Sequence, residues 1–123
     1  MHITVITEDE EIALILERAL AIRGYFVFMA EGQDGFIEHI NAKKKCELLI
    51  LDLRHNDYKD FLKYMQSDHK LIPVMVLSDD DSPKSIDDAI DLSVKEYIIT
   101  PFDLSLISER IQALLQIGNT NDE

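Results

Sequence analysis

Five short runs rich in β-branched, aromatic and aliphatic residues alternate with five segments whose apolar residues recur at helical spacing. The runs expected to be strands are ITVI (3–6), YFVFM (25–29), LLIL (48–51), IPVMVLS (72–78) and EYIIT (96–100). The segments expected to be helices span residues 10–23, 34–42, 60–67, 82–93 and 103–117. Strands joined through short helical crossovers form a parallel sheet with right-handed connections and helices on both faces. The alternation therefore predicts an α/β fold made of five βα units.

Cap residues support several of these boundaries. Gly24 can close the first helix in the left-handed conformation, and Ser82 followed by Pro83 is a strong helix start. The last helix is expected to end at Gly118, before the polar sequence NTNDE. The chain has no internal repeat, and 123 residues suit one domain. We predict one domain over residues 1–118, with residues 119–123 as a polar tail or the start of a linker.

The net charge narrows the range of partners. Lys and Arg total 12 against 24 Asp and Glu, which leaves a formal charge of −12. A domain this acidic is repelled by nucleic acids and anionic membranes, so we expect no direct nucleic-acid contact by this domain and no membrane partner. The single cysteine, Cys46, excludes a disulfide framework, and the acidic N-terminus is unlike a signal peptide. These features favour a cytoplasmic location.

Functional residues are expected where the strands end. In open parallel sheets, ligands bind at the carboxyl ends of the strands, at the point where the strand order reverses. For the flavodoxin-like order 2-1-3-4-5, that point lies between the first and third strands. The candidate site residues at the strand ends are therefore Thr7, Glu8, Asp52, Ser78 and Thr100.

Asp52 ends a strand whose four preceding residues are all apolar. Burying a carboxylate there is unfavourable unless another group compensates it. One interpretation is a helix or turn cap in the loop that follows. The other places Glu8 beside Asp52, where a hard cation such as Mg²⁺ relieves the repulsion between two carboxylates. No strand is followed by a glycine-rich phosphate loop, which argues against a nucleotide or flavin site.

With these residues in place, the chain resembles the receiver domain of bacterial response regulators, the CheY-like family, over residues 1–118. The matching motifs are the Asp of LLILDL, the Ser of PVMVLS, the aromatic of EYII, Pro73, and the pairs Gly24-Tyr25 and Pro101-Phe102. The resemblance implies that a histidine kinase phosphorylates Asp52 and that Ser78 and Tyr97 respond to the phosphoryl group. It also implies an Mg²⁺ site made by Glu8, Asp52 and the backbone carbonyl of Arg54.

The chain departs from the family pattern at several positions around Asp52. Thr100 stands where the family has a Lys that supplies positive charge to the phosphoryl group. Asp79 adds negative charge nearby. Arg54 either replaces part of the lost Lys charge or points into solvent from its loop. We therefore expect Mg²⁺ to bind weakly.

The acidic pair that follows the first strand in the family is also incomplete. Aligning the chain on Gly24 makes this pair Thr7-Glu8, so that one acid remains. A shift by one residue makes the pair Glu8-Asp9 but moves the first helix out of phase with Gly24.

These departures lead to three functional hypotheses. The first is an atypical receiver, or pseudo-receiver, which is a signalling module and not a turnover enzyme, and which acts through protein contacts with little or no phosphorylation. It would belong to a transcription regulator or be a free-standing protein. The second is a working phosphoacceptor in which Asp52 takes a phosphoryl group from a histidine kinase with the help of Mg²⁺. The third, a flavodoxin-like redox protein, is disfavoured by the missing phosphate loop.

The resemblance also suggests a dimer. In one branch of the family, the fourth helix, fifth strand and fifth helix form a face that makes a two-fold dimer. Glu96 and Arg110 match an ion pair that crosses the axis there, while Ile86 and Leu106 stand where another ion pair is expected. We therefore expect an isologous homodimer through this face. The alternative is a monomer in which Glu96 and Arg110 are solvated.

The expected cluster of carboxylates has an electrostatic consequence. Glu8, Asp52 and Asp79, with no Lys at position 100, should raise the pKa of at least one carboxyl. In that case Asp52→Asn would stabilise the metal-free protein at neutral pH. If Asp52 is instead a compensated structural group, the same substitution would destabilise it.

Overall fold

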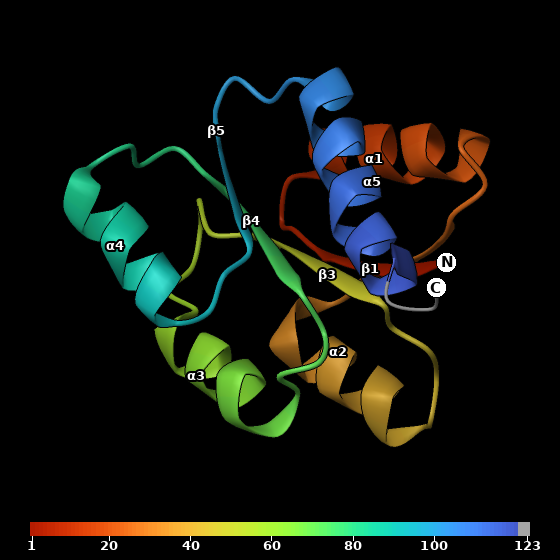
Figure 1. The fold of residues 1–123 in the computed structure, drawn as a ribbon, viewed down its shortest axis with the longest axis horizontal. Coiled ribbons are helices and arrows are strands. Elements are labelled where there is room, and N and C mark those ends of the chain that lie inside the picture. Colours follow the sequence, from red (N-terminus) through yellow and green to blue (C-terminus); the bar gives the residue numbers. More distant parts are fainter. Residues whose placement is uncertain (121–123) are drawn as a thin grey trace.

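Five βα units follow one another in the computed structural model, which describes residues 1–120, with side chains to residue 115 (Figure 1). The strands are β1 His2–Ile6, β2 Phe26–Ala30, β3 Leu48–Asp52, β4 Val74–Ser78 and β5 Glu96–Ile99. The helices are α1 Glu10–Ile22, α2 Gly32–Asn41, α3 Lys59–Asp68, α4 Pro83–Asp91 and α5 Leu104–Thr120. All neighbouring strands are parallel, in the order β2-β1-β3-β4-β5. The predicted fold class and strand order are confirmed.

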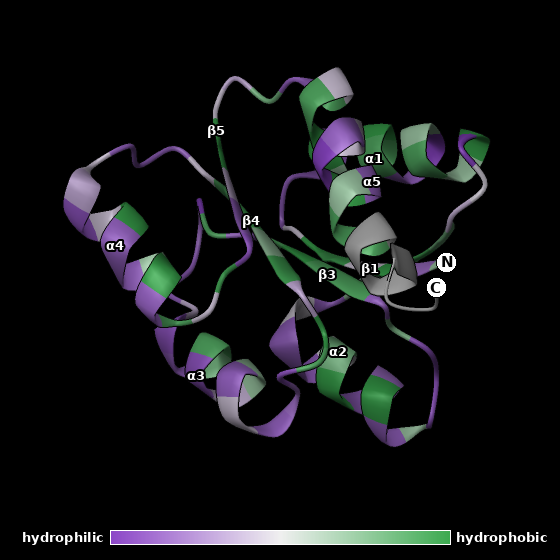
Figure 2. Cartoon of the chain, viewed as in Figure 1, coloured by the Kyte–Doolittle hydropathy of each residue, from purple (hydrophilic) through white to green (hydrophobic). Residues whose placement is uncertain are grey.

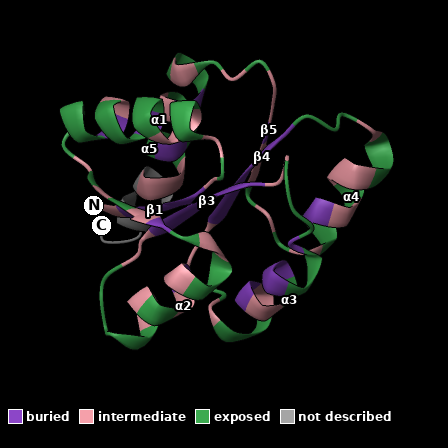
Figure 3. Cartoon of the chain, turned by 180° about the vertical axis from the view of Figure 1, so that it is seen from behind, coloured by how far each residue is buried: buried purple, intermediate pink, exposed green. Residues whose placement is uncertain are grey.

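Helices cover both faces of the sheet. Helices α1 and α5 lie together on one face, and α2, α3 and α4 lie on the other (Figure 1). One core cluster joins the sheet to Leu16 of α1 and Ile107 of α5, and a second joins it to Phe36 of α2 and Leu62 of α3. The central strands are mainly hydrophobic, while each helix carries both hydrophobic and hydrophilic residues (Figure 2). Every residue of β3 and β4 is buried, as expected for central strands of a parallel sheet (Figure 3).

The ends of the first and last helices test two of the predicted boundaries. Gly24 follows α1 with a φ of 90°, as predicted for a left-handed cap. The predicted end of α5 at Gly118 is wrong, because the helix continues to Thr120. A glycine lowers helix stability by only about 1 kcal/mol, which does not by itself end a helix.

Residues 121–123 of the predicted tail lie outside the described residues. Over the described chain, no helix is both long enough and apolar enough to cross a bilayer.

Candidate functional site at the carboxyl edge of the sheet

The carboxyl ends of four neighbouring strands bring Thr7, Asp52, Ser78 and Thr100 to one edge of the sheet. Asp52 is the last residue of β3 and is only 4% exposed. Because β3 pairs with β1 on one side and β4 on the other, its carboxylate lies at the centre of this edge. A buried carboxylate is unfavourable unless it has hydrogen-bond partners or a neighbouring cation.

Four hydrogen bonds compensate the Asp52 carboxylate. Its Oδ1 accepts from the backbone N–H and from the Nε of Arg54, each at 3.0 Å. Its Oδ2 accepts from the Thr7 hydroxyl at 2.7 Å and from Arg54 Nη2 at 2.8 Å. A carboxylate has about four acceptor positions. The protein therefore supplies a donor for each of them, and three of the four donors belong to Arg54.

Arg54 also contacts the two neighbouring loops. Its Nη2 donates to Asp9 Oδ2 at 3.1 Å, and its guanidinium carbon lies 5.0 Å from the centre of the Phe102 ring, a cation–π contact. The Arg54 side chain is 15% exposed. The interpretation of Arg54 as a solvent-facing residue is therefore wrong. Its guanidinium joins the loops that follow β1, β3 and β5.

The guanidinium determines the electrostatics of the site. Burial alone would raise the pKa of Asp52, but the hydrogen bonds from Arg54 and Thr7 and the charge of Arg54 outweigh it, so the pKa is lowered. The pKa of Arg54 is raised, chiefly by its hydrogen bond to Asp52. The raised carboxyl pKa expected from the sequence is wrong for Asp52. That expectation counted the acidic neighbours and gave no weight to Arg54, which the sequence placed either at the site or in solvent.

The loop after β1 contributes Thr7 and Asp9 to the site. Asp9 is the N-cap of α1, where its Oδ1 accepts from the N–H groups of Glu11 and Ile12, while its Oδ2 reaches Arg54. Glu8 is exposed and lines a shallow depression with acidic residues of other loops. The acid of this loop that reaches the site is therefore Asp9. The sequence signal for it was the preference for Asp immediately before a helix, a preference that the Gly24 alignment overlooked.

This arrangement does not fit the predicted Mg²⁺ site. The two acids at the centre, Asp52 and Asp9, both bond the same Arg54 nitrogen, so a guanidinium lies where two carboxylates converge. Among the described residues, no group of three or more His, Cys, Asp or Glu is placed to hold a metal ion. Glu8 does not join Asp52 there, and the role of the Arg54 carbonyl as a ligand stays a prediction.

The other half of the edge lies at the ends of β4 and β5. Ser78 is 4% exposed, and its Oγ accepts from the N–H of Asp80 at 3.0 Å. The Tyr97 hydroxyl lies 3.0 Å from Ser78 Oγ and donates to the Asp80 carbonyl at 2.7 Å. Thr100 is half-buried, and its N–H donates to the Ser78 carbonyl at 3.0 Å. The structure thus brings the predicted residues Ser78, Tyr97 and Thr100 together.

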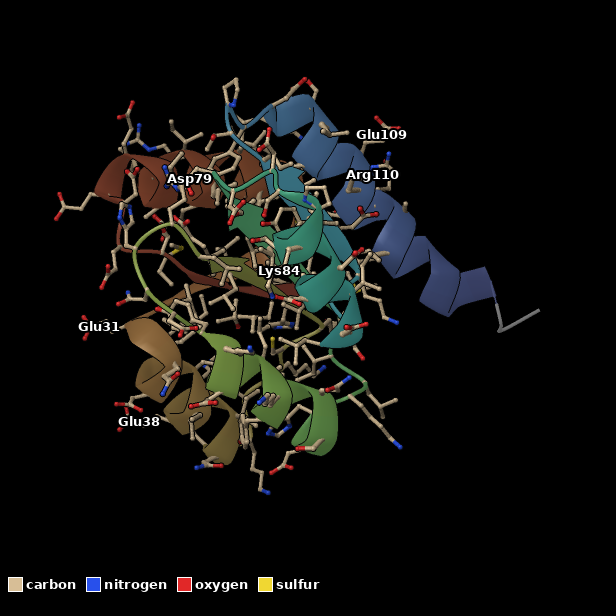
Figure 4. All side chains as sticks on the ribbon, turned by 90° about the vertical axis from the view of Figure 1, so that its left-hand side faces the viewer. Glu31, Glu38, Asp79, Lys84, Glu109 and Arg110 are labelled. Atoms are coloured by element: carbon tan, nitrogen blue, oxygen red, sulfur yellow. The ribbon has the colours of Figure 1, made fainter. Side chains whose placement is uncertain are left out.

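The residues of the predicted dimer face lie on α4, β5 and α5. Arg110 Nη1 is 4.0 Å from Glu96 Oε1 of the same chain, and Arg110 extends from the outer face of α5 (Figure 4). Leu106 is 36% exposed and Ile86 is half-buried. Glu96 and Arg110 therefore have each other as partners within one chain. Dimerisation stays a prediction.

Comparison with known proteins identifies the family. The model of the response regulator receiver domain family matches residues 3–112. The chain therefore belongs to this family, whose members are signalling modules of two-component systems that generally bind Mg²⁺ at the phosphorylation site.

Individual relatives are more distant. The chain is 26% identical over 123 residues to the probable transcriptional regulatory protein SilR of Salmonella typhimurium, covering 98% of this chain and 53% of SilR. It is 27% identical over 124 residues to the response regulator MprA of Mycobacterium leprae, covering 99% of this chain and 54% of MprA. The chain thus spans about half the length of these relatives.

Solved structures agree on the fold. A Francisella response-regulator receiver domain superposes with a TM-score of 0.85 at 19% identity, covering 95% of this chain and 98% of that one. A CheY-like receiver domain from Methanospirillum hungatei superposes with a TM-score of 0.86 at 16% identity, covering 98% and 97%.

Proposed function

We propose that this receiver domain is atypical and signals through protein contacts while Asp52 stays unphosphorylated. The observation that carries the proposal is the Asp52 carboxylate itself, which is buried and has a donor from Arg54 or Thr7 at every acceptor position. An oxygen that attacks phosphorus must have a free lone pair. Here each oxygen already accepts two hydrogen bonds.

The strength of these hydrogen bonds determines how much phosphoryl transfer to Asp52 is slowed. Hydrogen bonds that involve a charged group contribute about 1.5–3 kcal/mol each. Freeing one oxygen of Asp52 breaks two of them, at a cost of about 3–6 kcal/mol. Since each 1.4 kcal/mol is about a factor of ten, phosphoryl transfer to Asp52 should be slowed by about two to four orders of magnitude.

A second candidate function is a working phosphoacceptor, and Arg54 is the observation that favours it. A guanidinium binds phosphoryl oxygens in the same two-pronged geometry in which it binds a carboxylate. If Arg54 moved from Asp52 to an incoming phosphoryl group, it would supply the positive charge that Thr100 cannot. Asp52 would then be the nucleophile and a histidine kinase the phosphoryl donor.

The remaining parts of the proposal follow the family. We place the domain, over residues 1–118, in a cytoplasmic response regulator that controls transcription, with a histidine kinase among its partners. It is not a turnover enzyme, and it makes no direct contact with nucleic acid or membrane. It binds Mg²⁺ weakly, because the ion has to displace the Arg54 guanidinium from Asp52. The exposed side of α4, β5 and α5, with Ile86, Glu96, Leu106 and Arg110, is the face proposed for a homodimer.

The test is exposure of the wild-type protein to acetyl phosphate and millimolar Mg²⁺, followed by intact-mass measurement. Asp52→Asn controls for modification at other residues. We expect wild type and Asp52→Asn to remain equally unmodified. Near-stoichiometric modification of wild type within minutes, absent from Asp52→Asn, would overturn the proposal and promote the second candidate.

A further inference from the structure

Hydrogen bonds join helices α3 and α4 near their C-terminal ends. The Gln66 side chain near the end of α3 donates to the carbonyl of Asp91 at 2.9 Å and to Ser93 Oγ at 2.8 Å. A cavity of about 330 Å³ lies between α4, the N-terminal half of α3 and the loops that precede the two helices. Figure 4 looks onto this side of the molecule, with α3 and α4 side by side. We call this cavity the α3–α4 groove.

The α3–α4 groove is lined by buried apolar side chains together with polar and charged residues. Leu62 of α3 and Ala89 of α4 face it from the two helices, and both are about 95% buried within the chain. The hydroxyls of Ser78 and Tyr97 line it as well, but they lie 3.0 Å apart and are hydrogen-bonded to each other. An interior whose polar groups are already paired favours an apolar or aromatic side chain over a polar ligand.

The α4 side of the groove is strongly acidic. The segment 79–91, which forms the β4–α4 loop and α4, has six aspartates and one lysine, Lys84. Lys84 pairs with Asp88 at 3.0 Å and cancels one of the six negative charges, which leaves this segment a formal charge of −5. The N-terminus of α4 adds only about half a positive charge. Four aspartates and one lysine, Lys59, line the groove, so negative charge is in excess there: Asp57, Asp79, Asp80 and Asp88. The rim therefore attracts cations.

We propose that the α3–α4 groove binds a segment of a partner protein in which an apolar or aromatic side chain is flanked by Lys or Arg. The apolar walls take the central side chain, and the acidic rim pairs with the flanking cations. This inference rests on the proposed function, because it locates the protein contact through which an unphosphorylated receiver signals.

The groove is separate from the proposed dimer face. Ser85, Ala89 and Leu92 of the α4 region line it at helical spacing, so they share one side of the helix. Ile86 and Ile90 are each one residue further along and lie on an adjacent side, where Ile90 is 62% exposed. A partner segment in the groove therefore leaves the dimer face free.

The experiment uses three short synthetic peptides of equal length: one with Phe between Lys and Arg residues, one with Ala in place of that Phe, and one with Phe between Glu residues. Binding is followed by the amide NMR signals of the full chain. We expect the basic Phe peptide to shift signals of Leu62, Ala89 and Tyr97. The Ala peptide should bind at least about tenfold more weakly, and the acidic peptide should not bind.

Matched variants localise the binding. Asp79→Lys on the rim should weaken binding of the basic Phe peptide by about fivefold. Ala89→Leu, which fills the groove, should abolish its binding. Asp87→Lys makes the same charge change at an exposed position of α4 outside the groove, and it should have less than about a twofold effect.

The proposal is overturned if the basic Phe peptide leaves the groove signals unchanged at millimolar concentration. It is also overturned if the acidic peptide binds as well, or if Asp87→Lys weakens binding as much as Asp79→Lys. Mass measurement of Asp52 phosphorylation is independent of these outcomes. If no peptide binds the groove while Asp52 stays unmodified, this inference is rejected and the proposed function stands.

Discussion

The two halves of the carboxyl edge keep the family pattern to different degrees. At the ends of β4 and β5, Ser78 and Tyr97 have the residue types of the family and their hydroxyls lie 3.0 Å apart, while Thr100 replaces the family Lys. At the ends of β1 and β3, Asp52 is also kept, but Thr7 and Arg54 occupy its carboxylate. The comparison teaches that keeping a nucleophile in sequence does not keep its oxygens free. The hydrogen-bond donors around the carboxylate decide whether its oxygens are free.

Removing Arg54 should produce the largest change. Arg54→Ala leaves a buried carboxylate with one side-chain donor, Thr7, and no cation, which typically costs about 3–5 kcal/mol. We expect urea unfolding at pH 7 to give a loss of about 3 kcal/mol, since Asp52 can regain some stability by taking up a proton. Lys59→Ala, which removes an exposed cation from the first turn of α3, should change stability by less than about 0.5 kcal/mol. Equal losses in the two variants would contradict the account.

Neutralising Asp52 should give the second-largest loss of stability. Asp52→Asn keeps the shape but removes the charge that Arg54 faces, so it should lower the free energy of unfolding by about 2 kcal/mol. The double variant Asp52→Asn/Arg54→Ala should be less destabilised than the sum of the single changes, because each single change removes the same ion pair. Thermal melts in EDTA would test both. A higher melting temperature for Asp52→Asn than for wild type would restore the repulsive pocket expected from the sequence.

The pH dependence of that difference follows from the lowered pKa of Asp52. A carboxyl whose pKa is lower in the folded than in the unfolded protein stabilises the fold above its unfolded value, about 3.9, and loses this contribution as the pH falls through its folded value. The stability gap between wild type and Asp52→Asn should be constant from pH 7 to about 5 and should shrink below about pH 4. Urea unfolding across this range would measure it. A gap that widens in acid would mean that the Asp52 pKa is raised.

The contact between Arg54 and Phe102 should give the smallest effect. Phe102→Leu keeps an apolar side chain but removes the ring face 5.0 Å from the guanidinium carbon, so it should cost about 0.5–1 kcal/mol. In an Arg54→Ala background the same substitution should cost less, because the cation is gone. A cost that is unchanged in that background would assign the effect to packing alone.

The sequence predicted the backbone arrangement well, for a physical reason. Strand order and strand ends depend on apolar periodicity and short crossovers, which are local properties of the chain. Because Asp52, Ser78 and Thr100 each end or follow a strand, their meeting at one edge followed from the backbone alone. Tyr97 was placed in the same way, from its position in β5.

The side-chain chemistry at Asp52 was less predictable. Arg54 lies two residues past a strand end, and its direction depends on Asp9 and Phe102, which are distant in sequence. Glu8 was preferred over Asp9 because the first helix was aligned on Gly24 at its far end. The start of α1 is set instead by Asp9 as its cap. The Arg54 error concerns a side chain held by residues of other loops, which periodicity does not report. The Glu8 error overlooked a local cap signal.

The most direct test of the central claim is the binding of beryllofluoride, a phosphoryl mimic, to the wild-type protein in millimolar Mg²⁺, observed by fluorine NMR. If Arg54 and Thr7 hold every acceptor position of Asp52, no protein-bound fluorine signal should appear, and the amide signals of Ser78 and Tyr97 should stay in place. A bound fluorine signal that is present in wild type and absent from Asp52→Asn would contradict the account, because it would show that an Asp52 oxygen is free to bind.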